Sequence, residues 1–114
     1  GPYARKRDGS DIREPAARSR HPSYTVMPLA SVRELMRLQR LVRGRLANVR
    51  APILIAHGAH DRTARPSDAH TLHESVGSAE RRLLLLEASG HVATVDYDGA
   101  QLARATAEFL SRFA

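Results

Sequence analysis

Residues 52–58, Pro-Ile-Leu-Ile-Ala-His-Gly, decide the fold of this chain. Pro52 to Ala56 form a short apolar run without polar alternation, and His57 and Gly58 close it. Such a run is typical of a strand buried on both faces, as in a parallel sheet covered by helices. Leu83-Leu84-Leu85-Leu86 has the same character. The sequence therefore predicts buried strands over residues 52–56 and 82–86.

Helices are expected after each of these strands. Pro66-Ser67 favours a helix that opens there, runs to about Val76 and stops at Gly77. A last helix is expected from near Asp98, with Gln101 at the spacing of a capping box. Its expected buried face consists of Leu102, Ala105, Phe109, Leu110 and Phe113. The order strand, helix, strand, helix predicts an α/β fold.

The first half of the chain has a different character. Residues 3–23 show little periodicity and predict an irregular or weakly helical segment. A helix is expected from Ser31, because Ser31 and Glu34 have capping-box spacing, to near Gly44. Gly1-Pro2 has the form of a scar left by tag removal, so no structural element is predicted there. The apolar positions that recur at helical spacing are Val32, Leu35, Leu38, Leu41 and Val42.

Charge divides the 114 residues unevenly. Residues 1–50 carry 12 basic and 4 acidic side chains, whereas residues 51–114 carry 6 basic and 8 acidic ones. An Arg-rich helix over residues 31–50 leaves open a second interpretation, a non-catalytic basic module that binds an acidic partner or nucleic acid. Aromatic residues make up only 4% and no nucleic-acid motif is present, so we expect no nucleic-acid partner.

Composition excludes several other classes of protein. The chain has no cysteine, which excludes disulfides, a cysteine nucleophile and thiolate metal sites. No apolar run approaches the roughly 20 residues of a membrane span, and no signal peptide is recognisable. We therefore expect a cytoplasmic protein. Two parallel strands cannot form a sheet covered on both faces, so the chain is expected to be incomplete or to cover its edges as a homo-oligomer.

Two titratable residues follow the two predicted strands. Asp61 comes soon after the first strand, and His91 lies thirty positions later, after the second. Open α/β sheets place their sites at the carboxyl ends of the strands. A carboxylate that accepts the Nδ1 proton of an imidazole fixes its tautomer and leaves Nε2 free as a base. We expect the Asp61 carboxylate within roughly 2.6–3.2 Å of His91 Nδ1.

These residues lie in motifs that resemble a known family. Residues 49–61, which end in Ala-His-Gly-Ala-His-Asp, resemble the seventh strand and acid turn of α/β-hydrolases. Residues 89–96, Ser-Gly-His-Val-Ala-Thr-Val-Asp, resemble the histidine loop of the carboxylesterase and monoacylglycerol lipase branch. Residues 8–48 resemble, more loosely, the cap that this branch inserts after its sixth strand.

The resemblance implies a fold and an activity. The fold is the C-terminal part of an α/β-hydrolase sheet, its last two parallel strands with flanking helices, preceded by a mostly helical cap. Residues 1–48 are assigned to the cap or lid, and residues 49–114 to the core. The implied function is cleavage of small-molecule carboxylic esters by a serine esterase without any cofactor, with Asp61 and His91 as catalytic residues.

The same resemblance requires a nucleophile that the chain lacks. None of its serines lies in a Gly-x-Ser-x-Gly elbow. The implied partner is therefore an N-terminal α/β-hydrolase segment that carries the serine, and this chain alone should be inactive. Met27, Leu29 and Met36, in the cap segment, are candidate substrate-binding residues, because apolar walls suit an acyl chain.

The remaining polar residues have weaker assignments. His57 and His60 are expected to pack in the turn or face solvent, and Asp96 to brace the histidine loop or the start of the last helix. A zinc site is a third interpretation, for which the candidate ligands would be His57, His60, His70 and His73. It lacks a further ligand set, so no metal is expected.

Overall fold

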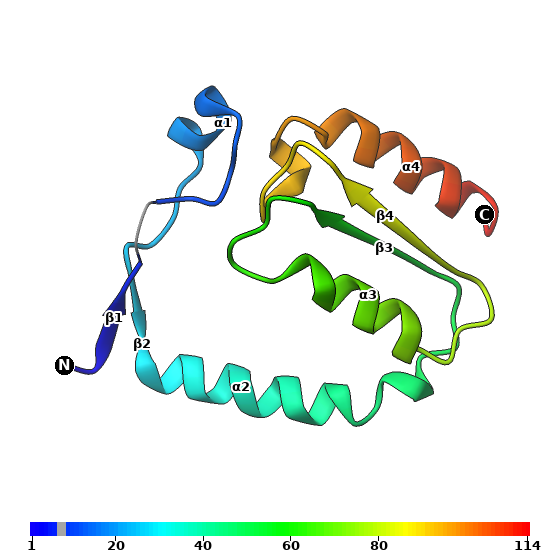
Figure 1. Ribbon diagram of the computed structural model, residues 1–114, viewed down its shortest axis with the longest axis horizontal. Coiled ribbons are helices and arrows are strands. Elements are labelled where there is room, and N and C mark those ends of the chain that lie inside the picture. Colours follow the sequence, from blue (N-terminus) through cyan, green and yellow to red (C-terminus); the bar gives the residue numbers. More distant parts are fainter. Residues whose placement is uncertain (7–8) are drawn as a thin grey trace.

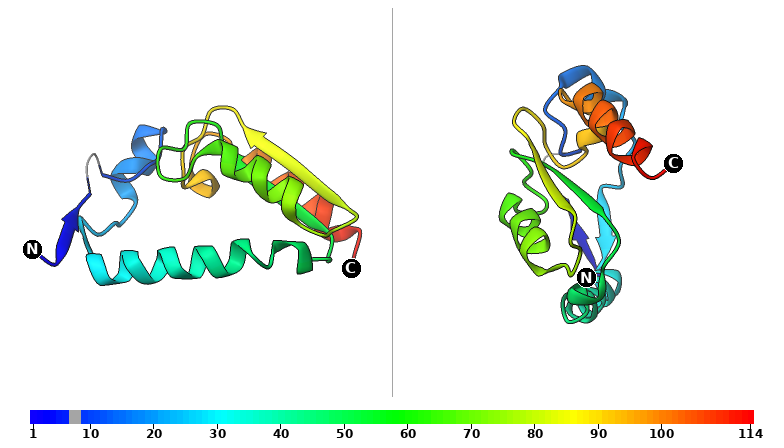
Figure 2. Two further views of the ribbon diagram at one scale, coloured as in Figure 1. Left: turned by 60° about the horizontal axis from the view of Figure 1, so that its bottom comes forward. Right: turned by 90° about the vertical axis from the view of Figure 1, so that its right-hand side faces the viewer.

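The computed structural model describes residues 1–6 and 9–114. Its second half is a two-stranded parallel sheet of β3 (Ile53–Gly58) and β4 (Arg81–Leu86), with Ile53 beside Arg81 and Gly58 beside Leu86. Helix α3 (Pro66–Ser75) connects the strands, and α4 (Gly99–Ser111) follows β4. The two helices cover opposite faces of the sheet (Figure 2). This is the strand and helix order that the sequence predicts.

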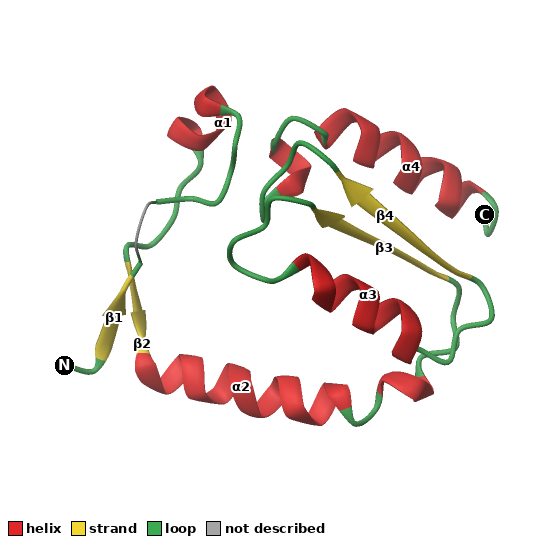
Figure 3. Cartoon of the chain, viewed as in Figure 1, coloured by secondary structure: helices red, strands yellow, loops and turns green. Residues whose placement is uncertain are grey.

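The first half lies at one end of this unit and along one of its sides (Figure 1). The short strands β1 (Tyr3–Arg5) and β2 (Val26–Pro28) pair antiparallel, and α1 (Pro15–Arg20) lies between them in the chain. Helix α2 (Leu29–Arg43) runs along the side of the molecule, and a 3₁₀ helix (Leu46–Asn48) leads into β3 (Figure 3). The weak helical tendency predicted for residues 3–23 is found in α1, but the β1–β2 pairing was not expected. Residues 7–8 of that segment lie outside the described residues.

The predicted start of α2 is wrong by two residues. The helix begins at Leu29, with Pro28 at its N-cap and no side-chain cap, so Ser31 caps nothing. The physical reason is that the Leu29 N–H donates to the backbone oxygen of Pro2 at 2.8 Å. Pro2, the residue before β1, thus supplies the acceptor that a capping side chain would otherwise provide.

Helix α4 begins where the sequence predicts, but the predicted capping box does not form. Asp98 is the N-cap, yet its carboxylate accepts hydrogen bonds from Ala88 N and Ser89 Oγ instead of capping the helix. The expected burial of Leu110 and Phe113 is also wrong, since they are 59% and 50% exposed. Phe113 lies beyond the last turn of the helix and packs edge-to-face on the buried Phe109.

The core is small and lies mainly between the sheet and its two helices. Strand β3 has Ile55 and Gly58 buried and its other residues half-buried, while Arg81 and Arg82 of β4 are exposed. The chain by itself therefore does not bury the strands on both faces. The buried apolar residues of the described chain are Ile12, Ala17, Leu46, Ile55, Ala69, Val76, Leu86 and Phe109.

Gly58, at the end of β3, lies very close to the backbone of the loop that follows β4. A Cβ at this position would lie 2.1 Å from the backbone oxygen of Gly90 and 2.6 Å from that of Ser89. We expect Gly58→Ala to lower the free energy of unfolding by about 1–3 kcal/mol, because backbone atoms must shift. The measurement is urea denaturation of both proteins.

Gly44→Ala is the matched control for this substitution. Gly44 has an ordinary helical backbone, and the nearest atom to its added Cβ is 3.7 Å away. The free energy of unfolding of the Gly44→Ala variant should therefore change by no more than a few tenths of a kcal/mol. Equal effects of the two substitutions would contradict the close approach at Gly58.

Candidate active site

The parallel register brings the predicted acid and base to one edge of the sheet. Beyond the strand ends, Ala59 N donates to Leu86 O at 2.9 Å and His60 N donates to Ser89 O at 3.0 Å. These bonds continue the pairing of β3 and β4 into the two loops that follow. Asp61 and His91 consequently come together, with Asp61 Oδ2 2.9 Å from His91 Nδ1. This separation lies in the range that the sequence analysis predicts.

The Asp61 carboxylate is buried and well supplied with donors. Its side chain is 2% exposed. Oδ1 accepts hydrogen bonds from Thr63 N and Ala64 N, each at 2.8 Å, so the turn folds around the carboxylate. Burial raises the pKa of Asp61, but the hydrogen bonds from Ala64, His91 and Thr63 outweigh it, and the pKa lies below its ordinary value. Asp61 is therefore ionised at neutral pH.

The contact with this carboxylate determines the tautomer of His91. An ionised carboxylate only accepts hydrogen bonds, so Nδ1 of His91 must donate. Nε2 is then the nitrogen left to accept a proton. The His91 side chain is 46% exposed, so the ring is open to a reacting group. Chemically, the pair can act as a general base whose protonated form is stabilised by Asp61.

His57 is a neighbour of Asp61 that the sequence analysis did not expect. It lies in β3 rather than in the turn, and its Nε2 is 3.0 Å from Asp61 Oδ2. The same nitrogen contacts the backbone oxygen of Ala64 at 3.0 Å, so it carries a proton. His57 therefore packs against the acid turn, which is the first of the two positions expected for it, and does not face solvent. A lone histidine at the end of an apolar run gave no signal for this contact.

Asp96 braces the histidine loop, as the sequence analysis predicts. The residue is 7% exposed. Its Oδ2 accepts hydrogen bonds from Gly90 N at 2.9 Å and Arg13 N at 2.7 Å. Its Oδ1 accepts from Glu14 N at 2.8 Å and Tyr97 N at 2.9 Å. Burial raises the pKa of Asp96, but these four backbone donors outweigh burial and hold the pKa below its usual value.

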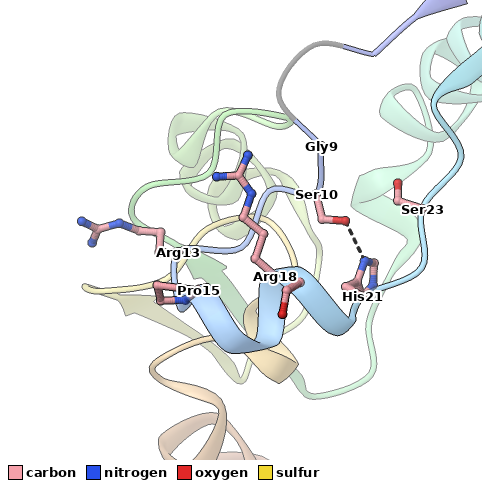
Figure 4. A pocket seen from close by; sticks show the side chains of 8 residues that line it. Gly9, Ser10, Arg13, Pro15, Arg18, His21 and Ser23 are labelled. Carbon is pink, nitrogen blue, oxygen red and sulfur yellow. Dashed lines mark hydrogen bonds between the residues drawn. The ribbon is translucent and has the colours of Figure 1, made fainter.

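Two serines near this region have structural contacts. Ser89 is fully buried, and its Oγ donates to Asp98 Oδ2 at 2.8 Å. Ser10 Oγ and His21 Nδ1 are 3.0 Å apart in a pocket of about 490 Å³ that Arg13 and Arg18 also line (Figure 4). This contact closes the loop that carries α1, and neither serine lies in a Gly-x-Ser-x-Gly sequence.

The candidate substrate-binding residues lie on β2 and α2. Met27, Leu29 and Met36 are 40%, 48% and 51% exposed. Each side chain is thus partly open to solvent in the described part of the chain. Their assignment stays a prediction.

The histidines proposed as zinc ligands form no metal site in the described structure. Within residues 1–6 and 9–114, no group of three or more His, Asp or Glu side chains is arranged to hold a metal ion. Over the same residues, no helix combines the length and apolar character needed to cross a membrane.

Comparison with known proteins identifies the family. The family model Hydrolase_4, described as serine aminopeptidase S33, matches residues 13–98. The chain belongs to this family. The match includes both Asp61 and His91, and it begins in the first half of the chain, within the segment assigned to the cap.

Two proteins that are similar to this chain are described as a lipase or as lipolytic. The thermostable monoacylglycerol lipase of Bacillus sp. (strain H-257) is 30% identical over 106 residues, which are 93% of this chain and 42% of the lipase. A solved structure from the work on LipS and LipT, two metagenome-derived lipolytic enzymes, is 28% identical with a TM-score of 0.86. That match covers 97% of this chain and 44% of the other. The chain thus spans less than half the length of these relatives, and it is part of an α/β-hydrolase fold.

The lowered pKa values make stability depend on pH. The unfolded carboxyls of Asp61 and Asp96 titrate near the ordinary value of about 3.9, above their folded values. Their stabilising contribution is complete above that pH and is lost as the pH falls through the lower folded values. We expect urea denaturation to give a falling free energy of unfolding as the pH is lowered from about 5 to about 2.

Asp96→Asn should reduce both the stability and its pH dependence. One amide oxygen replaces two carboxylate oxygens that accept four hydrogen bonds, so we expect a loss of about 1–3 kcal/mol at neutral pH. Asp68→Asn, on the exposed surface of α3, is the control and should change neither quantity appreciably. An unaltered acid slope in Asp96→Asn would contradict the assigned role of the carboxylate.

Proposed function

We propose that this chain supplies the acid and the base of a serine hydrolase that cleaves carboxylic esters. The observation that carries the proposal is the 2.9 Å contact between Asp61 Oδ2 and His91 Nδ1 at the ends of adjacent parallel strands. Membership of a serine-hydrolase family and the lipolytic relatives support the same chemistry. The lipase relative also makes a glycerol monoester a reasonable first substrate to test.

The proposed mechanism has two steps. In the first, His91 Nε2 takes the proton of the serine hydroxyl as its oxygen attacks the ester carbonyl, and it then gives that proton to the departing alcohol. Asp61 stabilises the imidazolium that forms in between. In the second step, water attacks the acyl-enzyme, with His91 again taking and returning the proton. No cofactor takes part in this scheme.

The serine must come from outside these 114 residues. None of their serines is flanked by the glycines of a nucleophile elbow. Among the described residues β3 pairs only with β4, so its other edge is available to a further strand. Helix α2 buries none of its residues, and the apolar side chains Leu35, Leu38 and Leu41, which recur at helical spacing on one face, are each more than half exposed. We assign this edge and this face to contact with the segment that carries the nucleophile.

The role of the pair is tested in the assembled enzyme, which contains this chain and the segment with the Gly-x-Ser-x-Gly elbow. Mass spectrometry of the intact purified material identifies that segment. We expect His91→Ala to abolish acyl-enzyme formation and Asp61→Asn to lower kcat by up to about 10⁴-fold. The measurement is a burst assay with a chromogenic ester.

Exposed residues of the same types provide the controls. His70→Ala and Asp68→Asn, both on α3, should retain the activity of the unmodified enzyme. Full activity in His91→Ala or in Asp61→Asn would refute the role proposed for that residue.

The second part of the proposal concerns the acyl group. Met27 on β2 and Leu29 and Met36 on α2 are exposed apolar side chains within the segment assigned to the cap. We assign them to the wall of an acyl pocket that is completed in the assembled enzyme.

Bulky substitutions test this assignment. Met27→Trp and Met36→Trp should shorten the preferred acyl chain, because each adds volume to the pocket wall. The measurement is kcat/KM for a series of p-nitrophenyl esters of increasing chain length. Tyr24→Trp, at a side chain 86% exposed, is the control and should leave the preference unchanged. An unchanged preference in both Met variants would remove the pocket assignment.

A further inference from the structure

The segment 11–14 lies across both catalytic loops although it is distant from them in sequence. Ile12 is 3% exposed and anchors the segment in the core. On one side of Ile12, the backbone oxygen of Asp11 accepts a hydrogen bond from Val92 N at 3.2 Å. On its other side, the N–H groups of Arg13 and Glu14 donate to Asp96. The histidine loop is thus attached to this segment at two points, Val92 and Asp96.

The Asp11 side chain holds the acid turn. Its Oδ2 accepts hydrogen bonds from Arg62 N at 2.8 Å and from Thr63 Oγ1 at 2.9 Å. Thr63 donates its own N–H to Asp61 Oδ1 at 2.8 Å. The turn that follows Asp61 is therefore held from two sides, by the Asp61 carboxylate within and by the Asp11 carboxylate outside.

Asp11 also touches the residue next to His91. A Cβ on Gly90 would lie 2.6 Å from Asp11 Oδ1 and 2.7 Å from Asp11 O, so only glycine permits this approach. Gly90 and Val92 flank His91, and both contact Asp11 through backbone atoms. A single residue thus contacts the turn beside the acid and the backbone on both sides of the base.

We propose that Asp11 is a positioning residue that aligns Asp61 with His91. It acts through Thr63 on the acid turn and through Gly90 and Val92 on the histidine loop, and it does not touch the substrate. The proposal rests on the proposed function, because alignment matters only if the pair is catalytic. Because Asp11 belongs to residues 1–48, the segment assigned to the cap, the alignment of Asp61 with His91 would also depend on that segment.

The geometry explains why such a residue is needed. The 2.9 Å contact between Asp61 and His91 joins two loops. Among the described residues, two backbone hydrogen bonds link these loops beyond the strand pairing, from Ala59 N to Leu86 O and from His60 N to Ser89 O. A shift of about 1 Å in either loop would break the alignment, and a misplacement of that size costs on the order of 100-fold in rate. The three hydrogen bonds to Asp11 restrain that shift.

The test uses four single variants of the assembled enzyme and one double variant. Asp11→Ala removes the side-chain acceptor, whereas Asp11→Asn keeps an oxygen that can accept from Arg62 N and Thr63 Oγ1. Thr63→Val removes one donor and preserves the shape of the side chain. Glu74→Ala removes an exposed carboxylate from α3 and is the control. Active-site titration counts competent sites, so kcat per site is separated from loss of folded protein.

The expected results distinguish positioning from simple stabilisation. Asp11→Ala should lower kcat per titrated site by about tenfold or more with KM changed less than about twofold, well below its melting temperature. Asp11→Asn should restore most of kcat, and Thr63→Val should lower it by a smaller factor. The Asp11→Ala/Thr63→Val double variant should lose less than the product of the two single losses, because they remove the same hydrogen bond.

Several outcomes would overturn the inference. It is wrong if Asp11→Ala matches Glu74→Ala in kcat per site, or if Asp11→Asn is as impaired as Asp11→Ala. If Asp11→Ala does not fold, Thr63→Val decides, and a kcat equal to that of Glu74→Ala is then the contradicting result. Activity that survives Asp61→Asn and His91→Ala overturns the proposed function instead. Loss of activity in those two variants with Asp11→Ala unaffected overturns only the role of Asp11.

Discussion

The parallel pairing of β3 with β4 is the constraint on which the rest of the structure depends. Because Gly58 lies beside Leu86, both strands end at the same edge, and the loops that follow them start side by side. The first backbone bonds beyond the strands, from Ala59 to Leu86 and from His60 to Ser89, preserve this arrangement. The contact between Asp61 and His91 follows from this register, although thirty residues separate them in the chain.

Buried carboxylates then replace regular secondary structure in the loops. Asp61 and Asp96 each accept backbone N–H groups that no strand or helix would satisfy, and Asp98 accepts the N–H of Ala88 and the hydroxyl of Ser89. A buried backbone donor without a partner is costly, so each carboxylate fixes the path of the loop around it. The same hydrogen bonds keep the pKa values of Asp61 and Asp96 low. For Asp61, a single set of contacts thus determines both the shape of its turn and its charge.

Apolar surface is exposed on helix α2. Strand β3 and helix α2 carry apolar residues in patterns that belong to buried elements, yet α2 buries none of its residues. The chain spans 42% of the lipase and 44% of the solved lipolytic structure to which it is similar. An apolar face that is open to solvent in this way marks an interaction surface, and we propose that the segment carrying the nucleophile covers it.

The sequence by itself determined the order of strands and helices in residues 52–114 and the two residues of the candidate pair. Apolar runs and helix-starting Pro66 are local features, and so are the motifs around Asp61 and His91, each of which follows a predicted strand, so they can be recognised without coordinates. Only the tertiary structure decided the β1–β2 pairing, the start of α2 at Leu29, the contact of His57 with Asp61 and the attachment of Asp11 to both catalytic loops. Each of these depends on a hydrogen bond or a close approach between residues that are distant in sequence or placed by a turn. Such contacts leave no periodic pattern, because a single backbone donor or acceptor is present at almost every position of the chain.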